Sequence, residues 1–337
     1  MRDGRRGALV ISLDFELRWG VRDQPWAEDY RDNLLGARRA VPAILRTFAE
    51  FGAHATWATV GLLFCESKRE MLQALPLRRP AYTRRGLSPY EAFDDVGENE
   101  REDPVHFALS LIRRIADTPH QEVGTHTFSH YYCLEAGQSE ADFREDLRVA
   151  VQVAREKIGQ GPQSIVFPRN QYSAAYTAVC SELGLVAYRG NPSHWAYRAR
   201  RDEDESWLRR GMRLADAYVP LTGRGWPPLD IAERAPVDVP ATRYLRPYAP
   251  ALRHLEPLRL RRIVSDLRQA ARLGGLFHLW WHPHDFGSHL QANLSVLRSI
   301  LTCFTGLREA YGMESLSMAE AANRALGAGE PRLAARA

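Results

Sequence analysis

Two carboxylates at the end of the first apolar run are well placed to do chemistry. The run Leu9–Phe15 (LVISLDF) is apolar and partly β-branched, which predicts a buried strand. Because side chains alternate along a strand, Asp14 and Glu16 share one face, and the apolar side chains share the other. In parallel α/β folds, functional sites form at the C-terminal ends of strands. We therefore expect a functional pair; the alternative is two polar residues entering a loop.

A histidine pair follows another predicted strand. The segment Thr125-His126-Thr127-Phe128-Ser129-His130 comes directly after Gln121–Thr125. Two imidazoles four residues apart meet on one side if the chain turns helical there. Neutral imidazole is a ligand for several divalent metals. The spacing therefore indicates a metal site, the alternative being two unrelated polar residues.

A third cluster closes the late apolar strand Leu276–Trp281. His282 lies at the C-terminal end of this strand, before a proline, where an imidazole could bind a metal or transfer a proton. His278 lies deep in the same strand, and we interpret it as a core histidine with satisfied hydrogen bonds. His284 and Asp285 are interpreted as loop residues that cap the following helix.

A fourth polar cluster, Phe167-Pro168-Arg169-Asn170-Gln171-Tyr172, also follows a predicted strand. The planar guanidinium of Arg169 matches the geometry of a carboxylate, which favours a role beside an acid. The alternative is an ordinary surface arginine. All four clusters converge if their strands form a barrel.

The order of the elements indicates how these clusters are positioned. The expected strands are Leu9–Phe15, Ala53–Val60, Gln121–Thr125, Ser164–Phe167, Leu185–Tyr188 and Leu276–Trp281. The expected helices are Asn33–Phe51, Pro104–Ala116, Ser139–Ile158, Ala174–Leu183, Leu258–Leu273, Leu290–Tyr311 and Leu316–Leu326. Such alternation favours parallel βα units, so we predict one α/β barrel over residues 7–326, with insertions at 67–103 and 198–250. Residues 1–6 and 327–337 are expected to be flexible ends.

The composition excludes several classes of protein. Of 337 residues, 45% are hydrophobic and 26% charged, which excludes wholesale disorder. The net charge of +4 is too small to indicate nucleic-acid binding. The arginine-rich runs Arg198–Arg201 and Arg259–Arg262 are interpreted as solvated helix faces. The dinucleotide, nucleotide-triphosphate, serine-hydrolase and HExxH motifs do not occur.

Cysteine content and hydropathy bear on location. The four cysteines form no CxxC pair, which favours a reducing compartment. The apolar stretch Ala8–Leu13 is too short for a signal peptide, and no run approaches the ~18 apolar residues of a membrane span. We therefore expect a cytoplasmic protein; peripheral membrane contact and the oligomeric state stay open.

In this order along the chain, the motifs resemble those of the polysaccharide deacetylase family, the NodB-homology domain of carbohydrate esterase family 4. The acidic pair of SLDFE, the sequence His126-Thr127-Phe128-Ser129-His130 (family motif H-[ST]-x-x-H) and the late His282-Pro283 carry the resemblance. The segment HATWATVG resembles the family's Ala-Thr-Phe-Phe strand, and Leu316–Ala321 its closing segment. The resemblance covers roughly residues 8–325, with the middle insertions unmatched.

The resemblance implies a distorted (β/α)7 barrel, similar to a TIM barrel, that holds one divalent metal ion. The implied ligands are Glu16, His126 and His130, and the implied ion is zinc, with cobalt, nickel, iron or manganese as alternatives. Family members commonly carry two adjacent aspartates where this chain has Asp-Phe-Glu. The roles of Asp14 and Glu16 as base and ligand could therefore be exchanged.

The resemblance also assigns catalytic roles. Asp14 would be the base that accepts a proton from the attacking water, and His282 the acid that protonates the departing amine. Arg169 would orient Asp14, although the family often has arginine before proline and here Pro168 precedes it. Such proton transfers contribute roughly 10²–10⁴-fold each.

The implied reaction is removal of the acetyl group from an N-acetylated sugar or glycan. A backbone N–H near Asn170–Tyr172 would stabilise the oxyanion. Asn170, Tyr172 and the aromatic Trp19 would contact the sugar. The expected cytoplasmic location favours a nucleotide- or lipid-linked precursor of a surface polysaccharide.

Three alternatives stay open. The first is a metal-dependent amidase that acts on a small non-sugar amide. The second uses His282 and His284 as an H-x-H metal pair, although barrels of that type place the pair on the first strand. The third is an inactive glycan-binding protein on the same scaffold.

Overall fold

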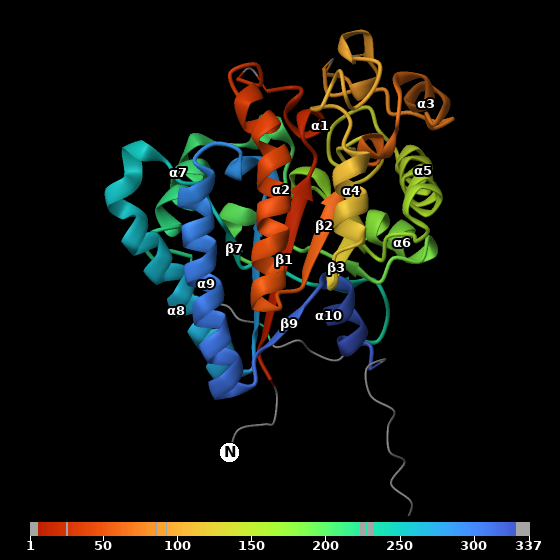
Figure 1. Cartoon of the computed structure of the whole chain (residues 1–337). Coiled ribbons are helices and arrows are strands. Elements are labelled where there is room, and N and C mark those ends of the chain that lie inside the picture. Colours follow the sequence, from red (N-terminus) through yellow and green to blue (C-terminus); the bar gives the residue numbers. More distant parts are fainter. Residues whose placement is uncertain are drawn as a thin grey trace, which may run out of the picture.

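A parallel sheet that curls into a barrel forms the centre of the molecule (Figure 1). The structure, a computed structural model, describes residues 6–327 except 25, 85, 92, 223–226 and 228–231. The chain ends 1–5 and 328–337, for which flexibility was predicted, lie outside the described residues. The strands are β1 (Ala8–Phe15), β2 (Ala55–Thr59), β3 (Gln121–Thr125), β4 (Ser164–Ile165), β5 (Ala187–Tyr188), β6 (Val237–Asp238), β7 (Arg243–Tyr244), β8 (Leu276–Trp281) and β9 (Glu314–Leu316).

One extended segment joins the two edges of this sheet. The strand order is β6-β5-β4-β3-β2-β1-β8-β7, and β9 pairs with β1. Between β6 and β7, Ala241 N donates to Gly190 O on the β5 side, and Thr242 N donates to His278 O of β8. The segment from β6 to β7 therefore acts as one bent strand that closes the barrel. This arrangement confirms the predicted distorted (β/α) barrel.

Helices cover the outside of the barrel (Figure 1). They are α1 (Arg18–Val21), α2 (Arg31–Phe51), α3 (Lys68–Gln73), α4 (Leu109–Ala116), α5 (Glu140–Ile158), α6 (Ala174–Glu182), α7 (Trp207–Asp216), α8 (Glu256–Leu273), α9 (Leu290–Tyr311) and α10 (Met318–Ala325). The sequence missed α1, α3 and α7, because all three are short, and α3 and α7 lie within the two long insertions. None of the described helices is long and apolar enough to cross a bilayer.

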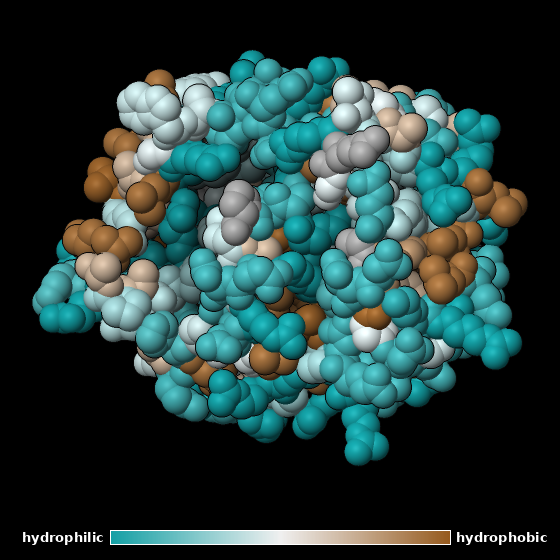
Figure 2. Space-filling model, turned by 90° about the horizontal axis from the view of Figure 1, so that it is seen from above, coloured by the Kyte–Doolittle hydropathy of each residue, from teal (hydrophilic) through white to brown (hydrophobic). Residues whose placement is uncertain are grey.

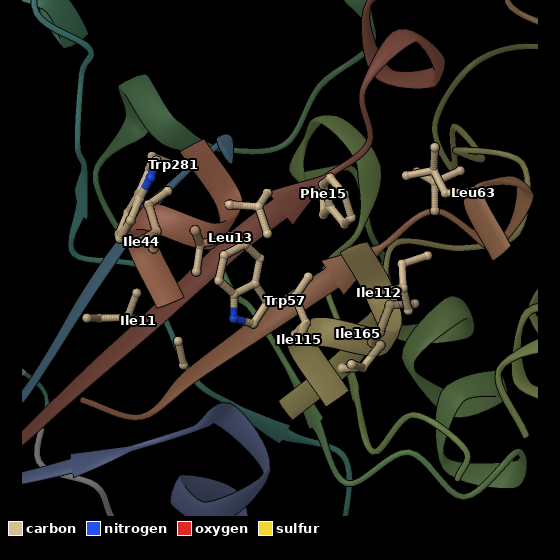
Figure 3. Close-up of a cluster of buried hydrophobic side chains, with 14 of the residues drawn as sticks. Ile11, Leu13, Phe15, Ile44, Trp57, Leu63, Ile112, Ile115, Ile165 and Trp281 are labelled. Atoms are coloured by element: carbon tan, nitrogen blue, oxygen red, sulfur yellow. The ribbon is translucent and has the colours of Figure 1, made fainter. Parts of the chain in front are cut away.

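The main core lies between the strands and the outer helices. Ile11, Leu13 and Phe15 of β1 point outward and are fully buried against α2 and α4 (Figure 3). Trp57 of β2 packs edge-on against Phe15. The opposite face of β1 points into the barrel and carries polar side chains near its C-terminal end, as strand alternation predicts. The apolar core thus fixes the strand on which the first two acids lie.

Candidate active site

The carboxylate of Asp14, at the end of β1, is held by an arginine from across the barrel. Arg189 directly follows β5, and its Nη1 and Nη2 atoms donate to Oδ1 and Oδ2 of Asp14 over 2.6 and 2.7 Å. Both side chains are buried. Burial alone would raise the pKa of Asp14, but the Arg189 guanidinium holds this pKa below its ordinary value. Asp14 is therefore an ionised carboxylate in a fixed orientation.

A hydrogen-bonded chain inside the barrel supports this pair. Ser12 Oγ accepts from Arg189 Nη1 over 3.0 Å and lies 2.8 Å from Nε2 of His278. The Nδ1 atom of His278 lies 3.0 Å from the carbonyl oxygen of Val239, so this nitrogen carries the proton and donates. Burial lowers the pKa of His278 to about 3. The contacts confirm the prediction of a satisfied core histidine.

Glu16, His126 and His130 direct their ligand atoms to one point, within 4.8 Å of one another. Glu16 Oε2 lies 3.2 Å from Nε2 of His126 and 2.9 Å from Nε2 of His130. His126 Nδ1 donates to the carbonyl oxygen of Val166 over 2.7 Å, so the lone pair of its Nε2 atom faces Glu16. Burial lowers the pKa of His130 to about 4 and keeps this imidazole neutral. One carboxylate and two imidazoles are a donor set that fits a divalent transition metal.

A tight loop, not the helical turn predicted from their spacing, brings the two histidines together. Thr127 and His130 adopt left-handed backbone conformations, with φ of 64° and 58°. Asp146 of α5 accepts hydrogen bonds from the N–H groups of Phe128 and Ser129 over 2.7 and 3.2 Å. Unfavourable backbone conformations persist only where surrounding contacts enforce them. Asp146 supplies such contacts here.

A glycine makes room for the Glu16 side chain. A Cβ atom on Gly20, in α1, would lie 1.9 Å from Cδ of Glu16. Any side chain at position 20 therefore displaces the carboxylate from its place beside the histidines.

His282, which follows β8, is held by the carboxylate of Asp285. Its Nδ1 atom lies 3.1 Å from Asp285 Oδ2, and Asp285 also accepts from the hydroxyl groups of Tyr30 and Tyr244 over 3.0 and 2.7 Å. Burial would lower the pKa of His282, but the carboxylates of Asp285 and Glu16 raise it to about 10. Asp285 was predicted only to cap the next helix. It caps the short turn Pro283–Phe286 and also orients His282.

His282 faces both acids of β1 across a cavity of about 360 Å³. Its Nε2 atom lies 3.9 Å from Oδ2 of Asp14 and 3.6 Å from Oε1 of Glu16. His126 and His130 line the same cavity. The structure therefore brings a carboxylate, a protonated imidazole and a three-residue ligand set to one place. This arrangement can accept and donate protons beside a bound cation.

Arg169 lies at the edge of this cavity and does not contact Asp14. Its guanidinium pairs with Asp23 and lies 4.4 Å above the ring of Tyr132. The prediction that Arg169 orients Asp14 is therefore wrong, because Arg189 makes that contact. The sequence carried the same signal for both arginines, since each follows a short strand. Only the curvature of the sheet decides which one reaches Asp14.

Of the three residues predicted to contact a sugar, Asn170 lines the cavity. Its backbone N–H donates to Phe167 O, and that of Gln171 donates to Pro168 O, so neither is free to stabilise an oxyanion. Trp19 is 1% exposed, and its indole N–H donates to the carbonyl oxygen of His106 over 3.0 Å. A sugar cannot stack on Trp19, and that prediction is wrong.

Tyr172 lies outside the residues that line the cavity, and its hydroxyl accepts from Asn191 N over 3.1 Å. Its predicted contact with the sugar finds no support in this position. Trp280 of β8 lines the cavity instead, with the Arg189 guanidinium 4.2 Å from its ring. Trp281, the next residue along β8, packs in the outer core, so alternation along the strand directs Trp280 inward.

Comparisons with known proteins agree with this geometry. The family model of polysaccharide deacetylases matches residues 30–188, a range that includes His126 and His130 but not Asp14, Glu16 or His282. No curated protein matches the chain. The match confirms the resemblance to this family over these residues, and the comparisons below show the shared fold.

Three solved structures share the fold. A protein described as a polysaccharide deacetylase from Mycobacterium smegmatis superposes with a TM-score of 0.61 at 15% identity, over 100% of this chain and 96% of that one. Puue allantoinase superposes with a TM-score of 0.56 at 13% identity, over 98% and 93%. The 4-alpha-glucanotransferase of Thermococcus litoralis superposes with a TM-score of 0.52 at 12% identity, over 97% of this chain and 41% of that one.

Proposed function

From the resemblance of this chain to the polysaccharide deacetylases, in residues 30–188 and in its barrel, we propose that it is a metal-dependent N-deacetylase of an N-acetylated sugar. One observation carries the proposal. The ligand set Glu16, His126 and His130 lies in the same cavity as an ionised Asp14 and a protonated His282. Hydrolysis of an amide needs these three functions in one place.

The ligand set determines what the cation would contribute. A divalent ion, which we propose to be zinc, would polarise the acetamide carbonyl and lower the pKa of water beside it. Glu16 is ionised, since His282 and His130 hold its pKa well below the ordinary value even though burial raises it. His126 is fixed in the tautomer that offers Nε2. Cobalt, nickel, iron or manganese are the alternatives that metal analysis distinguishes.

Asp14 and His282 divide the proton transfers. The Asp14 carboxylate is ionised and fixed, so it can accept a proton from the attacking water. The His282 imidazolium can donate its Nε2 proton to the nitrogen of the departing amine, because Asp285 holds the Nδ1 side. An amine leaves only when protonated, so both groups are needed in the same turnover. Each such transfer contributes roughly 10²–10⁴-fold.

We place the reaction in the cytoplasm, on a precursor or intermediate of a surface polysaccharide. All four cysteines are free thiols, which supports a reducing compartment. Cell fractionation tests this placement: activity in the culture medium or periplasm would contradict it.

The test is release of acetate from N-acetylated sugars by the purified protein. We expect release that stops with a chelator and returns when zinc is added. His282→Gln should lower turnover while the metal stays bound, and His130→Ala should lose both. Acetate release that persists in His130→Ala would contradict the metal mechanism. Hydrolysis of small non-sugar amides alone would favour the amidase alternative, and glycan binding without metal or turnover would favour an inactive binding protein.

A further inference from the structure

A second cavity of about 450 Å³ opens beside the catalytic one. The two share Arg169, Asn170, Tyr244, Trp280 and His282 in their linings, so they are continuous. Much of the second cavity is lined by residues of the insertion 198–250, of which Tyr244 also contacts Asp285 beside His282. A substrate held by its acetamide at His282 can therefore extend into it.

This second cavity is strongly cationic. Eight arginines line it, against the two carboxylates of Asp202 and Glu205. The run Arg198–Arg201 was interpreted as a solvated helix face. Its three arginines are exposed, as predicted, but the segment is not helical, and all four residues line the cavity. The cavity therefore gathers positive charge from several parts of the insertion.

Several of these arginines have no counter-ion. Arg198, Arg200, Arg210 and Arg246 form no ion pair with any described residue, whereas Arg213 pairs with Glu205. Arg169, which lines both cavities, pairs with Asp23, and its Nη1 atom lies 3.6 Å from Oδ1 of Asp202. Unpaired guanidinium groups that face one cavity repel one another unless an anion lies between them. Their planar donors match phosphate oxygens.

The surface beside this cavity is apolar. Helix α7 contributes Arg210 and Arg213 to the lining and also exposes Trp207 (83%), Leu208 (55%) and Leu214 (41%). The chain that follows exposes Val219 and Leu221. Hydrophobic side chains gather at the left margin of Figure 2, the side on which α7 and α8 lie in Figure 1. An exposed apolar face beside arginines is typical of helices that lie on a membrane surface.

We propose that the substrate is an N-acetylated sugar joined through phosphate to a lipid carrier. The phosphate binds in the arginine-lined cavity, and the apolar face of α7 rests on the membrane that holds the carrier. This inference rests on the deacetylase proposal for the sugar end of the substrate. A nucleotide carrier would supply the same phosphate but carries no lipid, so it would not explain the exposed apolar face.

The phosphate site is tested by binding, without turnover. Diphosphate and N-acetylglucosamine 1-phosphate are titrated calorimetrically into the full-length protein. We expect both compounds to bind more tightly than N-acetylglucosamine. The double variant R198Q/R200Q should lower the affinity for both about tenfold or more, because charge-assisted hydrogen bonds are lost. The matched control R261Q/R268Q removes two exposed arginines of α8 and should change the affinity less than about twofold. Equal weakening in both double variants, or no preference for the phosphorylated sugar, would overturn the proposal.

The lipid carrier is tested by comparing substrates. The initial rate of acetate release is measured with polyprenyl-diphosphate-linked N-acetylglucosamine in phosphatidylcholine vesicles and with UDP-N-acetylglucosamine in solution. We expect the lipid-linked substrate to be preferred, and W207S/L208S to lower its rate about tenfold. The control L72S/L77S, at exposed leucines of another surface, should not lower it. Preference for the nucleotide-linked sugar would overturn the lipid carrier.

The two proposals fail in different ways. Arginine-dependent diphosphate binding without acetate release from any sugar would contradict the deacetylase and retain the phosphate site. Equal acetate release from phosphorylated and plain sugars would retain the deacetylase and contradict the phosphate site.

Discussion

Arg189 and Asp14 form a bidentate ion pair across the inside of the barrel, with N–O distances of 2.6 and 2.7 Å. The pair joins the end of β5 to the end of β1, between which β2, β3 and β4 lie in the sheet. It therefore sets the direction of Asp14, the proposed base, and ties together two strands that do not pair with each other.

Replacing Arg189 with lysine should show whether catalysis depends on the fixed orientation of Asp14 or only on a positive charge beside it. Lysine keeps the positive charge but offers no planar pair of donors, so we expect kcat to fall about 10- to 100-fold with metal content unchanged. Arg262→Lys is the matched control, since Arg262 is also buried and pairs with Asp266 away from the cavity. Both variants should lower the melting temperature, and only Arg189→Lys should lower kcat. An equal loss of kcat in both would mean that Arg189 acts only through stability.

Replacing Asp285 with asparagine should move the pH profile. The pKa of His282 is raised to about 10, although burial lowers it, because Asp285 and Glu16 favour the imidazolium. An acid with a raised pKa is active below that pKa and is lost as the pH rises through it. Removing the Asp285 charge lowers this pKa, so the alkaline limb of kcat/KM should move to lower pH. Tyr30→Phe removes one hydrogen bond to Asp285 without a charge and should move the limb less. An unchanged limb in Asp285→Asn would show that His282 is not the acid.

Metal analysis should show which of two clusters of ligand-type side chains, among the described residues, binds the cation. One is Glu16, His126 and His130, and the other is His282, His284 and Asp285. We expect one divalent ion per chain in the wild type, none in His126→Ala and a full complement in His284→Gln. The second cluster disfavours a cation because His282 is protonated and Asp285 accepts from two tyrosines. Loss of metal in His284→Gln, measured by atomic emission, would place the ion in the other cluster.

A methyl group at position 20 should displace Glu16. The Cβ atom of Gly20→Ala would overlap the Glu16 carboxyl group, so we expect metal affinity to fall about 10- to 100-fold. Gly306→Ala in α9 meets nothing within 4 Å and should stabilise the protein by about 0.5–1 kcal/mol. Competition with a chromogenic chelator measures the first effect, and thermal unfolding the second. Unchanged metal affinity in Gly20→Ala would exclude Glu16 as a ligand.

Asp103 should contribute to stability in a pH-dependent way. Burial would raise its pKa, but His106 and the N–H of Gly97 lower it from 3.8 to about 2. A carboxyl group with a lowered folded-state pKa adds stability above its ordinary pKa and loses it as the pH falls. Asp103→Asn should therefore cost about 1–2 kcal/mol at pH 7, and the cost should shrink between about pH 4 and pH 2.

The control is Asp94→Asn, at an exposed residue. Its free energy of unfolding should stay within about 0.5 kcal/mol of the wild-type value at each pH. Denaturant unfolding at several pH values measures both variants. A cost for Asp103→Asn that is independent of pH would contradict the linkage.

The sequence located the candidate residues whose position depends on where a strand ends. It did not locate those whose position depends on the curvature of the sheet. Asp14, His126 and His282 could be located because each lies at the C-terminal end of a strand that the sequence predicted. The direction of Trp280 into the cavity agrees with the alternation of side chains along β8. Arg169 and Arg189 could not be told apart, because both follow short strands and only the curvature selects one.

Other failures have local causes. The loop that joins His126 to His130 contains left-handed residues that are not glycine, so nothing in its composition indicated the turn. The arginine-lined cavity lies largely in the insertion 198–250, where turns and proline residues obscure any periodic pattern of apolar residues. Charge pairing between segments far apart in the sequence decides which arginines stay free, and spacing carries no information about it.

The position of β8 beside β1 has a consequence for how the protein is made. Strand β1 pairs along Ala8–Leu13 with a strand that begins only at Leu276. Until β8 has been translated, one edge of β1 therefore has no partner, and an unpaired edge is a template for aggregation. A nascent chain that stops before β8 contains Asp14 and the proposed ligands Glu16, His126 and His130 but lacks His282, the proposed acid. Strand β8 thus covers the open edge of β1 and brings the proposed acid to the site at the same stage.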